Sequence, residues 1–438
     1  MPRVLTPQDV HSLMNLLVKE ATGQDAAIQV VDSSSFVSAG EQILATGTEN
    51  VLNSLSLVLG RTFMAVRPYK AKLAIINALN TDLYTSRMRK ISFYSREALA
   101  SGDFNTQLYT NLANGYDNGE NGTNQSGNPN STKSMWVQNP AVPLEMNFAG
   151  QSVWEDSTTV YEYQLKTAFR SEDDFAQFVS GIMTEKGNDI ESQKEAFNRM
   201  AILNHIAAIY ATEGTLASGR VVNLTKEFND RFGTAYTSAQ LRSTYLKEFL
   251  AFFVARFKLT SRMMTYRSAK YHWSPAKTVG GVSYTLLRHT PYDRQRVMLY
   301  EPLFTEAEAL VLPEIFRPNY LDIETQYEGI DYWQNINDPS AIDVVPAIPT
   351  ASGAQTVGSE VKLPYVVGMI YDADGLMIDY QLERSYSTPL EARKAYRNIW
   401  WSFSKNAISD LTENAIIFIM EDPSEEDGGE DGGEGGEG

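Results

Sequence analysis

The chain of 438 residues is 43% hydrophobic and 21% charged, enough apolar sequence to bury large cores in one to three domains. The absence of cysteine excludes disulfide bonds, thiolate zinc sites and cysteine nucleophiles. A net charge of −17 argues against a basic surface that grips nucleic acid, and the lack of any run of about 18 apolar residues argues against a membrane-spanning helix.

The first predicted element is a helix from about Pro7 to Ala21. Thr6 is placed to cap it, Pro7 occupies the first helical position, and Asp9 puts an acid in the first turn. The apolar stripe at helical spacing consists of Val10, Leu13, Met14 and Leu17. Residues 1–25 lack a charged segment followed by a continuous apolar run, so we expect no secretory signal peptide. The helix is either an arm that packs on another molecule or an ordinary helix of its own domain.

A basic arm is predicted between about Val66 and Gln164. Before it, the apolar stretch Val51–Gly60 is expected to form a buried helix. Within it, Met88–Ser95 alternates between apolar and polar residues, as a strand does. Asn111–Ser131 contains seven asparagines and four glycines, a composition typical of turns with almost nothing to bury. We therefore predict a long hairpin-like arm with a protruding tip.

A long helix is predicted from Ser171 to about Gly214. Ser171 can cap its N-terminus, and the acids of Glu172–Asp174 favour the positive end of a helix. Apolar residues recur at helical spacing along the whole stretch, with a break predicted between Gly181 and Gly187. At ~1.5 Å per residue the stretch would span about 60 Å, so we expect one long helix that forms the spine of its domain.

After the long helix, the sequence predicts a mixture of helices and strands. An amphipathic helix is expected from Ser238 to Phe257. Its apolar face consists of Leu241, Tyr245, Leu246, Phe249, Phe252 and Phe253. Val297–Tyr300 is predicted as a strand, and Thr305–Glu308 as a capping box that opens a helix over Ala309–Phe316. Another strand is expected to end at Tyr332–Trp333.

A loop and a hairpin are predicted next. Pro339–Pro364 is rich in Pro, Ala, Ser and Gly, and we expect an exposed inserted loop there. Tyr365–Ile370 and Leu376–Arg384 are predicted strands, and the turn Asp372–Gly375 lies between them. This pattern predicts a β-hairpin.

The end of the chain combines two apolar segments and an acidic tail. Ala395–Ile408 fits either a helix or a strand by periodicity alone, and Asn414–Met420 predicts a closing strand. Glu421–Gly438 then holds nine acids, seven glycines, one proline and one serine. This composition cannot bury apolar surface, so we expect a disordered tail that either solubilises the chain or docks on a basic partner.

No catalytic constellation is found in the sequence. The phosphate-binding loop, the nucleophile elbow, His-Glu-x-x-His and the dinucleotide fingerprint are all absent. The four histidines stand far apart: His11, His205, His272 and His289. His205 lies in an apolar helical pattern typical of a packed residue, Glu172–Asp174 suits a helix N-terminus, and Asp372 and Asp374 suit a turn. We therefore predict no catalytic, cofactor-binding or metal-binding residues.

Several segments resemble, in order and spacing, the major capsid proteins of tailed bacteriophages, closest to the small-podophage branch. These segments are Val51–Arg67, Arg89–Leu99, Leu165–Val179 with its Leu-Lys-Thr-Ala-Phe169, Arg296–Phe316 and Arg393–Met420. The resemblance implies an α+β fold shared with herpesvirus capsids, with an N-terminal arm, an extended E-loop, a P-domain with a long spine helix, and an A-domain. It also implies that Arg397–Ser404 is a strand.

The resemblance further implies a division of the chain. The parts are an N-terminal arm (1–35), a P-domain (36–65, 167–294 and 385–410), an E-loop (66–166), an A-domain (295–384 and 411–420) and the acidic tail (421–438). The loop Pro339–Pro364 departs from the family pattern, and no immunoglobulin-like C-terminal domain is expected.

The function implied by the resemblance is structural and not enzymatic. Hexamers and pentamers of the chain would tile an icosahedral shell that encloses double-stranded DNA by containment, assembled in the host cytoplasm and present in the virion. A portal protein and a scaffold or decoration protein would be partners, with no cofactor and no membrane. The candidate contacts between subunits join Arg87, Arg89 and Lys90 of the E-loop to Glu172 and Asp173 of a neighbouring spine.

Two alternatives belong to other classes of protein. A carbohydrate-active enzyme is suggested by 23 tyrosines and six tryptophans, and it predicts a monomer that binds or cleaves a glycan. A surface-layer or adhesion protein is suggested by the asparagine-rich tip, and it predicts export.

Overall fold

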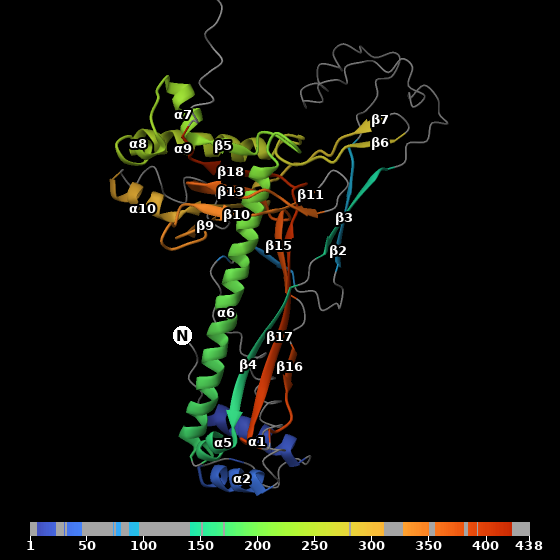
Figure 1. Cartoon of the computed structure of the whole chain (residues 1–438), viewed down its shortest axis with the longest axis vertical. Helices are drawn as coiled ribbons and strands as arrows, with labels where there is room; N and C mark the ends of the chain where they lie inside the picture. The colour runs from blue at the N-terminus through green and yellow to red at the C-terminus, as the bar shows by residue number, and fades with distance from the viewer. Residues whose placement is uncertain are drawn as a thin grey trace, which may run out of the picture.

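The computed structural model shows an elongated, mixed α+β molecule (Figure 1). It describes residues 7–22, 30, 33–45, 73, 76–79, 87–95, 141–149, 152–169, 171–279, 282–310, 327–349, 355–380, 384–391 and 393–422. Helix α6 (Glu172–Ala211) runs along the long axis. It connects a lower lobe, built from short helices, to an upper lobe, built from a five-stranded sheet and further helices.

Helix α6 is continuous over 40 residues. The hydroxyl of Ser171 accepts a hydrogen bond from the amide of Asp174 at 3.1 Å, so the predicted cap is confirmed. The predicted break between Gly181 and Gly187 is wrong. A glycine in a helix costs only about 1 kcal/mol, and the packing of Phe175, Val179 and Ile190 in the lower lobe outweighs that cost.

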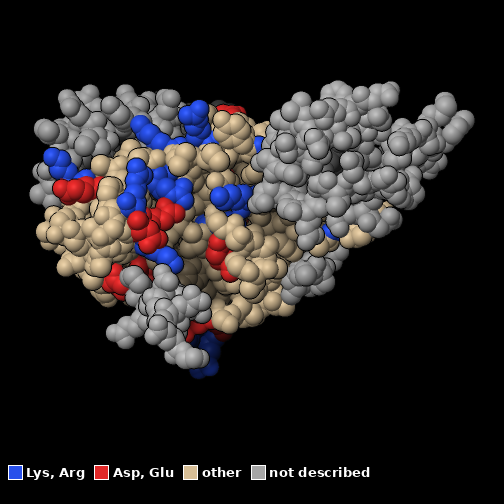
Figure 2. Space-filling view, turned by 90° about the horizontal axis from the view of Figure 1, so that it is seen from above, with Lys and Arg blue, Asp and Glu red and all other residues tan. Residues whose placement is uncertain are grey.

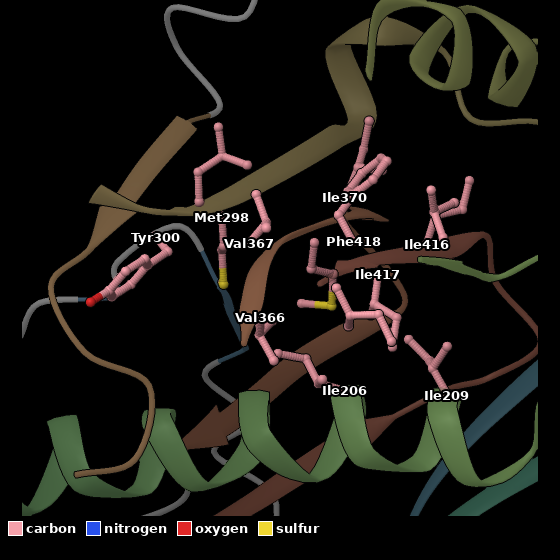
Figure 3. Close-up of a cluster of buried hydrophobic side chains, with 14 of the residues drawn as sticks. Ile206, Ile209, Met298, Tyr300, Val366, Val367, Ile370, Ile416, Ile417 and Phe418 are labelled. Atoms are coloured by element: carbon pink, nitrogen blue, oxygen red, sulfur yellow. The ribbon is translucent and has the colours of Figure 1, made fainter. Parts of the chain in front are cut away.

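The upper lobe is centred on a sheet, two strands of which are buried on both faces. The strand order is β5 (Val221–Asn223), β18 (Ala415–Ile419), β14 (Val366–Asp372), β8 (Gln295–Tyr300) and β9 (Tyr327–Ile330). Every residue of β14 and β18 is buried. Ile206 and Ile209 of α6 cover one side of this sheet (Figure 3). The predicted strands Val297–Tyr300 and Asn414–Met420 are therefore confirmed, and both lie in the core.

Four helices complete the upper lobe. They are α7 (Leu224–Phe232), α8 (Ser238–Ser243), α9 (Leu246–Met264) and α10 (Glu301–Leu310). The single helix predicted from Ser238 to Phe257 is two helices, whose apolar face packs on the sheet, with Phe253 and Phe257 each 5.7 Å from Phe418. Because of this packing, residues 224–264 share one core with residues 295–420, although the predicted division placed them in the P-domain.

Helix α10 begins four residues before the predicted capping box. It starts at Glu301, so Thr305 is an internal helical residue and the prediction was wrong. The capping box that the structure contains is at α8, where the Thr237 and Gln240 side chains bond each other's backbone amides. Trp333 lies beyond the end of β9 and is buried, with its indole N–H donating to the carbonyl of Val366 at 2.8 Å.

The lower lobe packs three helices around the first turns of α6. They are α1 (Pro7–Thr22), α2 (Ser33–Ala45) and α5 (Glu162–Ala168). Met14 and Leu17 of α1 are fully buried beside Phe36 of α2 and Phe175 of α6. The predicted helix at Pro7–Ala21 is confirmed, and it packs on α2 and α6 of its own chain. The N-terminal arm over residues 1–35 stays a prediction.

A second five-stranded sheet joins the two lobes. Its strands are β1 (Asn77–Leu79), β15 (Leu376–Tyr380), β17 (Tyr396–Ser409), β16 (Arg384–Ser387) and β4 (Ser152–Tyr161). The segment that periodicity left ambiguous is thus the longest strand, β17. Strand β4 pairs with β17 from Tyr396↔Tyr161 to Lys405↔Ser152, so it belongs to this sheet and does not project with the predicted arm.

The predicted hairpin does not form. Strands β14 and β15 have the expected positions, but β14 pairs with β8 and β18, whereas β15 pairs with β17 and β1. The turn between them carries the chain from one sheet to the other. Asp372 stabilises that turn by accepting a hydrogen bond from the amide of Asp374 at 2.9 Å.

The predicted loop at Pro339–Pro364 contains two short β-ladders. They pair β10 (Ile342–Val344) with β13 (Val361–Leu363), and β11 (Ala347–Pro349) with β12 (Gln355–Val357). Ile342 and Leu363 are buried, so the base of this segment is part of the core, while Val357 at its end is 80% exposed.

A two-stranded ribbon lies beside the upper part of the molecule (Figure 1). It pairs β2 (Arg87–Phe93) with β3 (Pro143–Ala149), which confirms the predicted strand at Met88–Ser95. Near it lies a smaller ladder, β6 (Lys277–Val279) with β7 (Val282–Tyr284). The short helix η1 (Tyr292–Arg294) directly precedes β8. The predicted helix Val51–Gly60, the tip Asn111–Ser131 and the tail after Asp422 lie outside the described residues.

Candidate assembly surface

The ribbon of β2 and β3 has two different faces. Its strands run antiparallel from Arg87↔Ala149 to Phe93↔Pro143, and successive side chains of β2 point to opposite sides. Lys90, Ser92 and Tyr94 share the inner face, which lies against the body. Arg89, Ile91 and Phe93 share the outer face.

The inner face is anchored to the body by a cluster of charges. The Lys90 ammonium lies 2.6 Å from Asp410 Oδ2 and 2.7 Å from Glu413 Oε1, and Arg288 Nη2 lies 3.1 Å from the same oxygen of Glu413. Burial acts to lower the pKa of Lys90, but the two carboxylates outweigh it and the pKa is raised. Burial raises the pKa of Glu413, yet with two cations bonded to it we treat it as ionised. We call Lys90, Arg288, Asp410 and Glu413 the anchor cluster.

Hydrogen bonds extend the anchor cluster along the ribbon. Arg288 donates to the Ser92 hydroxyl at 2.8 Å and to the Thr412 carbonyl at 3.1 Å. The Tyr94 hydroxyl donates to the carbonyl of Pro275 at 3.0 Å. Directional bonds of this kind fix the ribbon at one angle to the body, because each requires a particular donor and acceptor position.

The outer face of the ribbon is exposed. Ile91 is 51% exposed and Phe93 is 60% exposed. Arg89 forms an ion pair with Glu145 across the ribbon at 2.8 Å, with both side chains largely in solvent. An exposed pair of this kind contributes about 0–1 kcal/mol to folding, so the subunit does not need it for stability. The outer face combines two large apolar side chains with one charged pair, as protein interfaces do.

Two kinds of feature are not found among the described residues: a metal-binding cluster and a membrane-spanning helix. No group of three or more His, Asp or Glu among them could hold a metal ion. His205 and His272 are buried, and burial lowers the pKa of each to about 4, so both are neutral packing residues, as predicted for His205. No helix in the described ranges is long and apolar enough to cross a membrane.

Comparison with known proteins identifies the chain. The family model described as Phi29-like phage major capsid protein matches residues 146–419, more than half of the sequence. The chain belongs to this family. It is therefore a phage major capsid protein, a structural and non-enzymatic component of the virion that forms the head shell. The prediction from sequence is confirmed, and the enzyme alternative is wrong.

Solved structures of phage capsids are also similar to the chain. The capsid of Staphylococcus phage Andhra matches at 11% identity and a TM-score of 0.48, over 81% of this chain and 85% of that chain. The structure of head fiber and inner core protein gp22 of native bacteriophage P68 matches at 11% identity and 0.48, over 81% and 86%. The capsid of the cyanophage P-SCSP1u matches at 8% identity and 0.37, over 82% and 90%. A search of curated proteins found no match.

The candidate contact residues of this capsid protein lie at two ends of the molecule. Arg87, Arg89 and Lys90 lie on β2, beside the upper part of α6, whereas Glu172 and Asp173 open α6 in the lower lobe. The structure does not bring the two groups together within one subunit. Lys90 binds carboxylates of its own subunit, and Arg89 is an exposed cation of the outer face.

Sequence reasoning missed the anchor cluster. Lys90 is 320 residues away from Asp410 along the chain, and no local pattern connects the two. One signal was present in the sequence. Asp410 and Glu413 directly precede a fully apolar strand, where burying an acid without a cation would cost free energy.

Proposed function

We propose that this capsid protein tiles a closed icosahedral shell, as hexamers and pentamers, by laying the outer face of its ribbon on a neighbouring subunit. The single observation that carries the proposal is an anchored ribbon whose outer face exposes Ile91 and Phe93. An extended element that crosses a neighbour buries more area than a compact face of the same size, and symmetry repeats each modest contact around the shell.

The subdomains of the tailed-phage capsid fold are part of this proposal. We assign the ribbon to the E-loop within 66–166, α6 to the P-domain as its spine, and the upper lobe to the A-domain. The packing of α9 on Phe418 and of α7 on β5 and β18 supports adding residues 221–264 to the predicted A-domain segments 295–384 and 411–420.

The proposed contact joins Arg89 of one subunit to the α6 N-terminus of the next, where Glu172 and Asp173 stand. Opposite charge on two elements in different parts of the molecule supports this pairing, because one subunit cannot close it alone. Packaged double-stranded DNA would be held by containment, since the chain carries a net charge of −17. A portal protein and a scaffold or decoration protein complete the proposed set of partners.

Charge reversal at the ribbon tests the proposal. Arg89→Glu should lower the unfolding free energy by no more than about 1 kcal/mol, because Arg89 and its partner Glu145 are both exposed, and should prevent shells from forming. The assay is electron microscopy of sedimented material from cells expressing the variant. Lys362→Glu is the matched control, since Lys362 is also exposed and paired with acids but lies on β13, away from the ribbon. Normal shells from Arg89→Glu would overturn the proposed contact.

A further inference from the structure

The exposed face of α9 is basic, although the chain as a whole is acidic. Residues 246–270, which comprise α9 and the segment that follows it, carry six Lys or Arg and one acid, Glu248. The six cations are Lys247, Arg256, Lys258, Arg262, Arg267 and Lys270. All except Arg256 are exposed. Figure 2, which looks down on the upper lobe, shows Lys and Arg side chains on this end, with Asp and Glu side chains beside them.

Three of these cations form a row along α9. Lys258 lies eleven residues after Lys247, and Arg262 lies one turn after Lys258, so the helical repeat places all three on one side. Like charges one turn apart destabilise an isolated helix. The C-terminal end of a helix favours a cation, which accounts for Arg262 in the last turn but not for Lys247 in the first. A row of this kind is suited to a negatively charged segment.

The acidic tail leaves the body at the same end of the molecule. The amide of Ser238 donates to Asp422 Oδ1 at 2.5 Å, and the Asn223 side chain donates to the carbonyl of Glu421 at 3.0 Å. Ser238 begins α8 and Asn223 caps α7, and both helices contact α9. The chain therefore continues past Asp422 from the corner that adjoins the basic face.

The tail is long enough, and charged enough, to cover that face. The sequence continues for the sixteen residues 423–438, seven of them acids and none of them aromatic or aliphatic except proline. At about 3.3 Å per extended residue it reaches up to about 50 Å. Helix α9 spans about 28 Å at 1.5 Å per residue. A tethered segment has an effective concentration of the order of millimolar, so weak charge pairing is enough to keep it bound.

We propose that residues 423–438 bind the basic face of α9 in their own subunit and thereby compete with other polyanions for it. Tethered carboxylates occupy the row formed by Lys247, Lys258 and Arg262. The subunit then does not bind nucleic acid through its upper lobe before it is built into a shell. The inference does not depend on the ribbon contact, which involves other residues.

The experiment is a double-mutant cycle on the full-length chain. One change converts the seven acids of residues 423–438 to Gln and Asn, which preserves the length of the tail. The other is Lys258→Gln with Arg262→Gln. The readout is the affinity for a short single-stranded DNA, measured by fluorescence anisotropy at about 50 and 200 mM salt. Arg393→Gln with Lys394→Gln is the matched control, because these two exposed cations lie in the turn before β17, at the lower end.

The tail-neutral chain should bind DNA about tenfold more tightly at the lower salt, because phosphate contacts become available. The Lys258/Arg262 change should remove most of that gain in the tail-neutral chain and have little effect beside the native tail. The Arg393/Lys394 control should leave the gain intact. If there is no gain, or if both Gln pairs reduce the gain equally, the tail acts only through net charge and the proposal is overturned.

Discussion

The central strand β14 and the ribbon strand β2 are both seven residues long but are held in place by different forces. All residues of β14 are buried, in contact with β8, β18 and α6. Strand β2 alternates between buried and exposed side chains, and the anchor cluster holds its inner face against the body. Apolar burial has no preferred direction, whereas the ion pairs of the anchor cluster require one position of the ribbon. The core therefore stabilises the subunit, and the anchor cluster positions the ribbon.

The largest expected effect comes from removing a core ring. Phe418→Ala should lower the unfolding free energy by about 4 kcal/mol, because a buried aromatic side chain leaves a cavity among Phe253 and Phe257. Thermal and denaturant unfolding would measure the loss. Val357→Ala, at an 80% exposed position, is the control and should change little. A loss below about 1 kcal/mol would mean that this core can collapse around the cavity.

The second largest effect is expected from breaking the anchor cluster, which should loosen the ribbon more than the core. Lys90→Met should cost about 3 kcal/mol, because it leaves the buried Asp410 without its cation. Hydrogen exchange should increase in β2 and β3 more than in β14. Arg89→Met removes the exposed pair with Glu145 and should cost less than about 1 kcal/mol. Equal exchange in the ribbon of Lys90→Met and wild type would show that the other bonds of the ribbon are sufficient.

Acid should lower the unfolding free energy, because two buried histidines are neutral in the folded chain and become protonated when it unfolds. The pKa of His205 is lowered by burial to about 4, and Asp410 only partly opposes that effect. The unfolded chain takes up this proton at about pH 6.5, so the stabilising contribution of the neutral ring is complete above pH 6.5 and is lost as the pH falls toward 4. At pH 5 the loss is about 2 kcal/mol for one histidine. His272, whose pKa is also about 4, adds a similar loss.

The variant His205→Gln measures how much of the loss of stability in acid comes from His205. Whatever its stability at pH 7, this variant should lose stability about half as steeply as wild type between pH 6.5 and 5, since one of the two titrating rings is gone. Denaturant midpoints over that range provide the slope. An unchanged slope would assign the acid sensitivity to groups other than His205.

The sequence was sufficient to locate most elements and most of the core. The N-terminal helix, the cap at Ser171, the strand of the ribbon and the closing strand follow from local spacing and confirm the predictions. Local spacing works because side-chain periods of 3.6 and 2 are properties of the chain itself. The strand β17 needed the family resemblance, since its run of apolar residues fits both periods.

Helix ends were less predictable than helix positions. The glycines of α6 predicted a break, and Thr305 predicted the start of a helix. Packing in the two lobes outweighed both signals, so α6 is continuous and α10 begins at Glu301. Intrinsic propensities amount to about 1 kcal/mol per residue, which burial of one large side chain exceeds. Local signals therefore decide a boundary only where tertiary contacts do not compete with them.

By itself the sequence determined which segments are helices and strands, which of their faces are apolar, and the family to which the chain belongs. Only the tertiary structure decided which strands pair and which charges meet. Strands β14 and β15 flank a turn and still join different sheets, and Lys90 meets Asp410 across 320 residues. The physical reason is that a periodic pattern involves only neighbouring residues, whereas the pairing of strands and of charges depends on the free energy of the whole packed molecule.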